Sequence, residues 1–138
     1  MPGVSTQIVT VRAPRRGLHD ITDTIVRVVS KSGLDSGMCT LFIRHTSASL
    51  IIQENYDPSA RVDLETFLDR LVPEGASWIT HTLEGDDDMP SHIKSVLTQV
   101  SVSIPILEGK LALGTWQGIY LWEHRDRPTP REILVSVF

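Results

Sequence analysis

The chain has 138 residues, with 13 Lys and Arg against 17 Asp and Glu and a formal net charge of −4. This length predicts a single domain over residues 1–138 that can bury a core without disulfides. The sequence has no basic stripe interleaved with aromatic residues, no signal-peptide pattern and no apolar run of about 18 residues, so neither nucleic acid nor a membrane is an expected partner.

Alternation of polar and apolar residues predicts a first strand over residues 6–12. Asp20 then stands as the expected N-cap of a helix with apolar residues at helical spacing, and Gly33 is expected to end it. Residues 38–44 alternate again and predict a strand with at least one buried face. Cys39 lies in this strand and is the only cysteine, so we expect a buried thiol in a reducing, cytoplasmic compartment.

The small polar residues 45–49 separate this strand from another over residues 50–52, and such a break lets a ligand approach the backbone closely. Asp57 and Pro58 then open a helix as cap and first-turn residue. This helix is expected to end at Pro73. Its apolar residues, expected to form a buried stripe, are Val62, Phe67, Leu68 and Leu71.

A polar segment over residues 78–94 follows, and Pro90 in it marks the first turn of a short helix over residues 91–99. The next strand, residues 100–106, contains Pro105, which cannot donate a hydrogen bond, so this strand is expected at an edge or irregular at that point. Glu108 and Gly109 are typical of a hairpin turn.

Gly114 and Gly118 flank a Trp-Gln pair and predict a bulge or a close backbone approach within a strand that continues over residues 119–124. Residues 131–138 form the last alternating pattern. Helices are expected mainly in the first half, between strands, and strands dominate the second half. The sequence therefore predicts the α+β class, a single compact domain built mainly on an antiparallel sheet with about three short helices.

Three histidines are candidate metal ligands because each is placed at the end of a predicted element. His45 follows a strand, His81 is expected to end another strand, and His92 is expected to open a helix. Three imidazoles with one open position suit zinc. Residues 86–88 are aspartates, which could hold magnesium instead. The alternative for each histidine taken alone is an ordinary packed or surface residue.

The same region offers groups for a small phosphorylated molecule. The helix start near Ser91 presents unpaired N–H groups, Lys94 adds a cation, and Arg125 can hold a phosphate through two hydrogen bonds. Thr46 and Ser47 lie in the small polar break that would approach such a ligand. The candidate catalytic groups are Glu123, Arg125 and Gln117. The alternative for residues 123–125 is a charged strand end that runs into a turn.

Five blocks of the sequence, taken in order, are His45-Thr-Ser-Ala-Ser, Glu54-Asn-x-Asp57-Pro, Gly85-Asp-Asp-Asp-Met-Pro-Ser-His92-Ile-Lys, Gly114-Thr-Trp-Gln and Glu123-His-Arg. Together they resemble the YjbQ family, also called secondary thiamine-phosphate synthase. The resemblance implies a compact α+β domain that assembles as a homotrimer, with polar sites near subunit boundaries around His45, His81 and His92. Asp88 and His124 stand where relatives often differ, so the resemblance does not make either an obligatory ligand.

Two functions follow as hypotheses. The resemblance implies a weak thiamine-phosphate synthase, which joins a pyrimidine pyrophosphate to a thiazole phosphate with metal-assisted loss of pyrophosphate. The alternative is a metal- or phosphometabolite-binding protein, or a metal-dependent hydrolase. The expected cofactor is a divalent metal, zinc rather than magnesium at the histidines, and imidazole ligands fit the alternative better than a magnesium-dependent synthase. The large apolar surface of Trp78, Trp116 and Trp122 is a second ground for the trimer.

Overall fold

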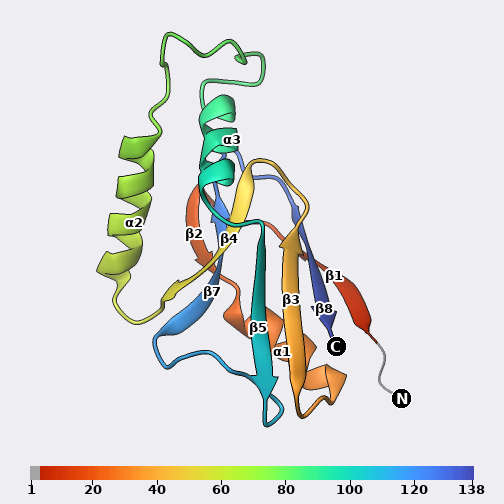
Figure 1. The fold of residues 1–138 in the computed structure, drawn as a ribbon. Coiled ribbons are helices and arrows are strands. Elements are labelled where there is room, and N and C mark those ends of the chain that lie inside the picture. Colours follow the sequence, from red (N-terminus) through yellow and green to blue (C-terminus); the bar gives the residue numbers. More distant parts are fainter. Residues whose placement is uncertain (1–3) are drawn as a thin grey trace.

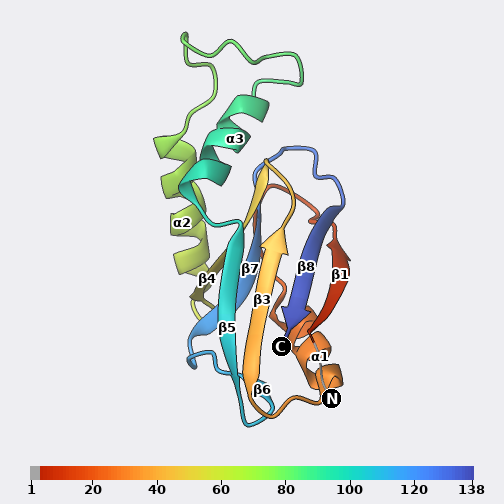
Figure 2. The ribbon, with the colours of Figure 1, turned by 45° about the vertical axis from the view of Figure 1, so that its right-hand side comes forward.

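The computed structural model describes residues 4–138. A five-stranded antiparallel sheet forms one layer, with the strand order β1-β8-β3-β5-β6 (Figures 1 and 2). The strands are β1 (Ser5–Val11), β8 (Arg131–Val137), β3 (Gly37–Ile43), β5 (Ser101–Leu107) and β6 (Lys110–Leu111). The four longer ones confirm the predicted strands to within one or two residues. In the central strand β3, Cys39 is fully buried as predicted, and burial raises the pKa of its thiol to about 11.

Pro105 has no N–H, and it is tolerated in β5 because no acceptor on β3 requires a donor at this position. Its cross-strand neighbour Met38 directs both its N–H and its carbonyl toward Phe138, away from β5. On the other side the short β6 pairs only with Ile106 and Leu107. The prediction that the strand is edge-like at Pro105 therefore matches the pairing.

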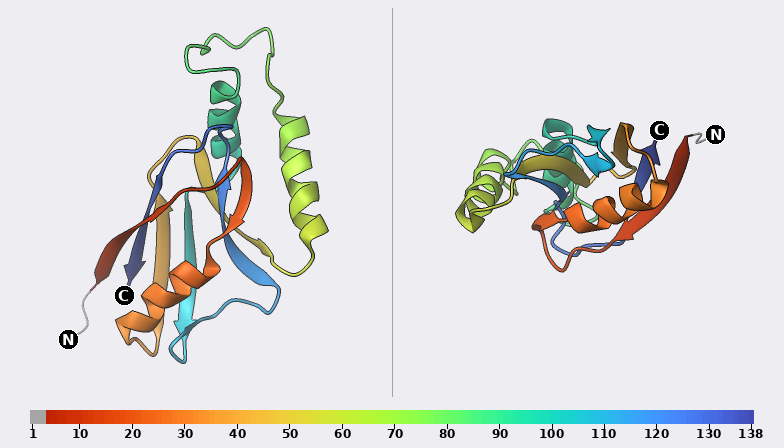
Figure 3. Two further views of the ribbon diagram at one scale, coloured as in Figure 1. Left: turned by 180° about the vertical axis from the view of Figure 1, so that it is seen from behind. Right: turned by 90° about the horizontal axis from the view of Figure 1, so that it is seen from below.

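A three-stranded antiparallel sheet with the order β2-β7-β4 lies behind the first sheet, as the rear view in Figure 3 shows. Its strands are β2 (Gly17–Asp20), β7 (Gln117–Glu123) and β4 (Ala48–Glu54). The predicted bulge at 114–118 is wrong, because residues 114–116 form a turn before β7 begins. The predicted close approach is present at Gly118, where an added Cβ would lie 3.1 Å from Cβ of Asn55.

The first helix, α1 (Thr22–Ser32), packs Ile25 and Val29 into the main core, which also takes residues from both sheets. Gly33 ends the helix with φ 70°, as predicted. The predicted cap is off by one position. Ile21 is the N-cap residue, and Asp20 accepts a hydrogen bond from the Thr22 N–H instead.

The second helix, α2 (Pro58–Leu71), stands beside the three-stranded sheet (Figure 1). Asp57 caps it as predicted and accepts the Ser59 N–H. The predicted buried stripe is wrong. Only Leu68 is buried, against Leu18, Val72, Tyr120 and Trp122, whereas the exposed apolar residues are Val62, Phe67 and Leu71.

The third helix, α3 (Asp88–Leu97), begins three residues earlier than predicted, so Pro90 lies in its first turn but His92 lies in its second turn rather than at its opening. Residues 72–87 connect α2 to α3 above the sheets (Figure 1) and contain no strand, so the strand predicted to end at His81 is wrong. Within residues 4–138, no helix is long and apolar enough to cross a membrane.

Candidate metal centre

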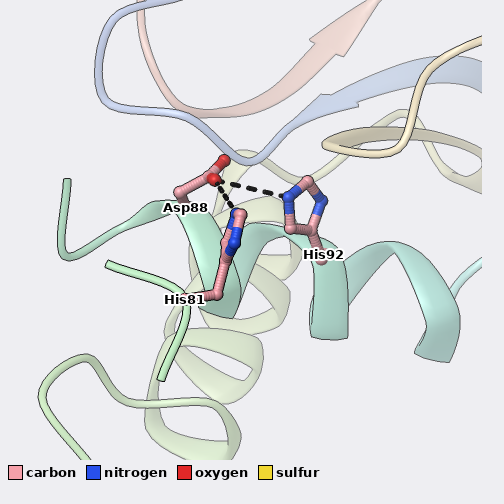
Figure 4. Close-up of side chains that lie close together, drawn as sticks. All are labelled: His81, Asp88 and His92. Atoms are coloured by element: carbon pink, nitrogen blue, oxygen red, sulfur yellow. Dashed lines mark hydrogen bonds and ion pairs between the residues drawn. The ribbon is translucent and has the colours of Figure 1, made fainter. Parts of the chain in front are cut away.

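Two imidazoles and one carboxylate meet at the start of α3 (Figure 4). Asp88 and His92 are four residues apart on the helix and therefore share a face, and His81 reaches them from the 72–87 connection. Nε2 of His81 forms a hydrogen bond of 2.6 Å with Oδ2 of Asp88, and Nε2 of His92 lies 3.4 Å from the same oxygen. One ligand atom from each residue lies within 4.8 Å of the other two, which fits the donor set of a divalent metal.

His92 is oriented by the backbone of the loop between β3 and β4. Its Nδ1 lies 2.8 Å from the carbonyl oxygen of Thr46, which can only accept, so Nδ1 carries a proton. In the neutral ring, Nε2 then directs its lone pair toward Asp88. A lone pair facing a carboxylate needs a cation between them, either a proton on Nε2 or a metal ion, so this arrangement is compatible with a metal ion.

Asp88 is a buried charge, 1% exposed, and its second oxygen is neutralised by Arg125. Nη1 of Arg125 lies 2.6 Å from Oδ1 of Asp88, and Nε lies 3.0 Å from Oδ2 of Asp87. Burial alone would lower the pKa of the guanidinium, but Asp87 and Asp88 raise it above its ordinary value. Arg125 was predicted to be catalytic and to bind phosphate. In the structure, most of its side-chain N–H groups donate to acceptors within the protein.

Asp87 also holds the turn that follows β7, which contains Arg125 and Asp126. Its Oδ2 also accepts the backbone N–H of Asp126 at 2.9 Å. Burial would raise the pKa of Asp87, but this hydrogen bond and the Arg125 guanidinium hold it below its ordinary value. The start of α3 and the turn after β7 are therefore joined by charged hydrogen bonds.

His45 is not part of the group formed by His81, Asp88 and His92. Its Nε2 accepts the backbone N–H of Glu132 at 2.8 Å, so this nitrogen has no free lone pair. Burial first, and then the nearby Arg131, lower the pKa of His45. His45 instead lines a cavity of about 660 Å³ with His92. The other residues that line it are Thr46, Ser95, Val96, Thr98 and Val100.

The groups predicted to bind phosphate are mostly engaged inside the protein. Ser91 is buried, with Oγ 2.6 Å from the carbonyl oxygen of Asp87. Lys94 is also buried, and its Nζ lies 2.6 Å from Oδ1 of Asp69 on α2. The Ser47 carbonyl accepts from Arg131. Of this set, Thr46 is the one that lines the large cavity.

The three residues predicted as catalytic do not converge. Glu123 is fully buried and accepts from Nε of Arg131 at 2.8 Å. Gln117 lies at the opposite end of β7, about 20 Å away along a seven-residue strand, and closes a turn by accepting the Gly114 N–H. Arg125 is the only one of the three that contacts the metal-binding group, through Asp88.

One buried polar pair was not predicted from the sequence. Nε2 of His124 lies 2.8 Å from Oγ of Ser49, and both residues are almost completely buried. Burial, and then the charges of Lys94 and Arg131, lower the pKa of His124 to about 3. The pair has no access to solvent, so it is a structural feature rather than a nucleophile and its base.

Comparison with known proteins gives one consistent result. Residues 7–138 match the family model described as UPF0047 protein YjbQ-like. A UPF0047 protein of Synechocystis is 52% identical over 131 residues, which cover 95% of this chain and 89% of that protein. YjbQ of Salmonella typhimurium is 45% identical, with 94% of each chain covered.

Solved structures agree with the sequence comparison. A YbjQ-like protein of unknown function from Sulfolobus solfataricus superposes with a TM-score of 0.88 at 30% identity, covering 98% of this chain and 96% of that one. An uncharacterised protein of the yjbq/upf0047 family from Clostridium acetobutylicum superposes with a TM-score of 0.86 at 34% identity, covering 96% and 99%. Both the fold and the sequence similarity thus extend along nearly the whole chain.

Proposed function

This chain belongs to the YjbQ-like UPF0047 family, and we propose that it binds a divalent metal ion through His81, Asp88 and His92, with a small phosphorylated molecule beside the ion. The observation that carries the proposal is the buried Asp88 carboxylate with two imidazole nitrogens around one of its oxygens. Two imidazoles and a carboxylate with an open position favour zinc over magnesium, which prefers oxygen ligands.

A divalent ion in this position would stabilise negative charge on a phosphate and lower the pKa of a bound water. Asp88 supplies the negative charge that attracts the ion, and the Thr46 carbonyl holds His92 in the tautomer that can bind it. Within the described part of the chain, the large cavity beside His92 is lined by no Lys or Arg. We therefore place the uncharged organic part of the ligand in the cavity and its phosphate toward the metal ligands.

We propose weak thiamine-phosphate synthase activity as the reaction, on the strength of the five sequence blocks that resemble the family. Purified protein is incubated with the pyrimidine pyrophosphate and the thiazole phosphate, with zinc or magnesium added after removal of bound metal. Thiamine phosphate should form in the presence of metal and be lost in Asp88→Asn and His92→Ala. The matched control is His19→Ala, because His19 lies outside the site and hydrogen-bonds the Arg15 carbonyl.

The alternative is a metal- or phosphometabolite-binding protein, or a metal-dependent hydrolase. Stoichiometric zinc without thiamine phosphate would favour this alternative, and release of inorganic phosphate from simple phosphate esters would favour the hydrolase. A protein that binds neither zinc nor magnesium would contradict the metal proposal itself.

We also propose that the chain assembles as a homotrimer. The proposal is supported by apolar side chains that a single chain leaves uncovered, on α2 and at Trp78 and Trp116. Trp122 gives no such support, because it packs beneath α2 within the same chain. Sedimentation equilibrium at micromolar concentration tests this assembly.

A further inference from the structure

The two carboxylate oxygens of Asp88 have different partners. Oδ1 accepts from Nη1 of Arg125 at 2.6 Å, whereas Oδ2 faces Nε2 of His81 and Nε2 of His92. The side chain is almost completely buried, so water does not compete for either oxygen. As a result, Asp88 presents a single oxygen to the two histidines.

Arg125 is itself held in place by several groups. Its Nε donates to Oδ2 of Asp87 at 3.0 Å, and its Nη2 donates to the Glu84 carbonyl at 2.7 Å. Its backbone N–H donates to Oε2 of Glu123 at 3.1 Å, which anchors the residue to the end of β7. A planar guanidinium with these partners holds the orientation of the Asp88 carboxylate, which a flexible ammonium group could not do.

From this geometry we propose that Arg125 is a positioning residue, which occupies one oxygen of Asp88 and so makes Asp88 a single-oxygen ligand. The inference rests on the proposed metal site. One oxygen and two imidazole nitrogens suit the low coordination number of zinc, whereas magnesium and calcium require six or more ligands, mostly oxygen. Without Arg125, both oxygens of Asp88 become free to reach the ion, and the preference for zinc should weaken.

The test uses cobalt(II) as a probe of coordination number, because four-coordinate cobalt absorbs visible light much more strongly than six-coordinate cobalt. Wild type, Arg125→Gln and Arg125→Lys are titrated with cobalt, and zinc and magnesium affinities are then measured by competition. Arg127→Gln is the matched control, since Arg127 is an exposed arginine on the same turn and lines the same small cavity as Arg125.

Wild type and Arg127→Gln should give the strong absorption of four-coordinate cobalt. Arg125→Gln should lose zinc affinity by about 10- to 100-fold, the usual cost of removing a partner of a metal ligand, and should give weaker absorption. Arg125→Lys should show the same spectral change despite its retained charge. If the Gln variant does not fold, as judged by circular dichroism, the Lys variant decides the question.

Unchanged affinity and absorption in the folded variants would overturn the role of Arg125 while leaving the metal site intact. Reduced affinity with an unchanged spectrum would also overturn it, because Arg125 would then contribute charge but not ligand geometry. Absence of zinc and cobalt binding in wild type would overturn the metal site, and the role of Arg125 with it.

Discussion

Nδ1 of His92 lies 2.8 Å from the carbonyl oxygen of Thr46, 46 residues away in sequence. This contact ties α3 to the loop between β3 and β4 and selects the tautomer in which Nε2 can bind a metal. The same loop offers the Ser47 carbonyl to Arg131. The metal-binding group is thus supported by backbone groups as well as by side chains, and these supports can be tested separately.

Acid should destabilise the protein through His124. Its pKa is about 3 in the fold, against an ordinary value of 6.5, so the unfolded chain binds a proton that the folded chain does not. Stability is therefore lost as the pH falls below 6.5, by about 1.4 kcal/mol per pH unit at most and by about 2 kcal/mol at pH 5. Urea unfolding of wild type and His124→Gln, with a chelator present, measures this effect.

The difference in unfolding free energy between wild type and His124→Gln should shrink from pH 7 to pH 5. His19→Gln, in which the altered histidine is not in the core, serves as the control and should follow the wild-type curve. Parallel curves for wild type and His124→Gln would show that His124 does not remain neutral in the fold.

The buried pair of Glu123 and Arg131 should be structural. Arg131→Met leaves an unpaired buried carboxylate and should lower the free energy of unfolding by about 3–5 kcal/mol. The double variant Glu123→Leu/Arg131→Met should lose less than Arg131→Met alone, because no charge is then left buried. Chemical denaturation measures all three proteins.

An exposed ion pair that involves Glu132, the neighbour of Arg131 on β8, is the control for this cycle. Arg44 and Glu132 form a salt bridge in which both side chains are more than 40% exposed. Arg44→Gln should therefore change stability by less than about 1 kcal/mol. Equal costs for Arg44→Gln and Arg131→Met would contradict the distinction between the two pairs.

Charge on the exposed face of α2 should break the proposed trimer. Phe67 is 63% exposed in the single chain, so Phe67→Glu should fold normally yet shift sedimentation equilibrium toward monomer. Val26→Glu is the matched control on α1, where Val26 is 41% exposed. A wild-type protein that is monomeric at micromolar concentration, or a Phe67→Glu variant that remains trimeric, would contradict the proposal.

The sequence predicted the strands of the five-stranded sheet well because alternation is a local signal, and it predicted the ends at Asp57 and Gly33 because caps require particular residues. The helix on which His92 lies was predicted to begin at residue 91. Its true start at Asp88 places Asp88 and His92 on one face, and only then does their spacing of four residues indicate a pair of ligands.

Other features depend on contacts between distant segments. His45 was grouped with His81 and His92, but its Nε2 meets the Glu132 N–H because of how β8 pairs with β3, and no local pattern reveals that register. The α2 stripe was predicted to be buried because its spacing is helical. Spacing identifies an apolar face but not what covers it.

Zinc titration of four single variants and of the double variants tests the central claim most directly, namely that His81, Asp88 and His92 form one metal site. His81→Ala, Asp88→Asn and His92→Ala should each lower zinc affinity by at least about 100-fold, and the double variants should lose little more because the ligands act together. His45→Ala should keep stoichiometric zinc. Retention of zinc by the first three variants, or its loss in His45→Ala alone, would contradict the assignment.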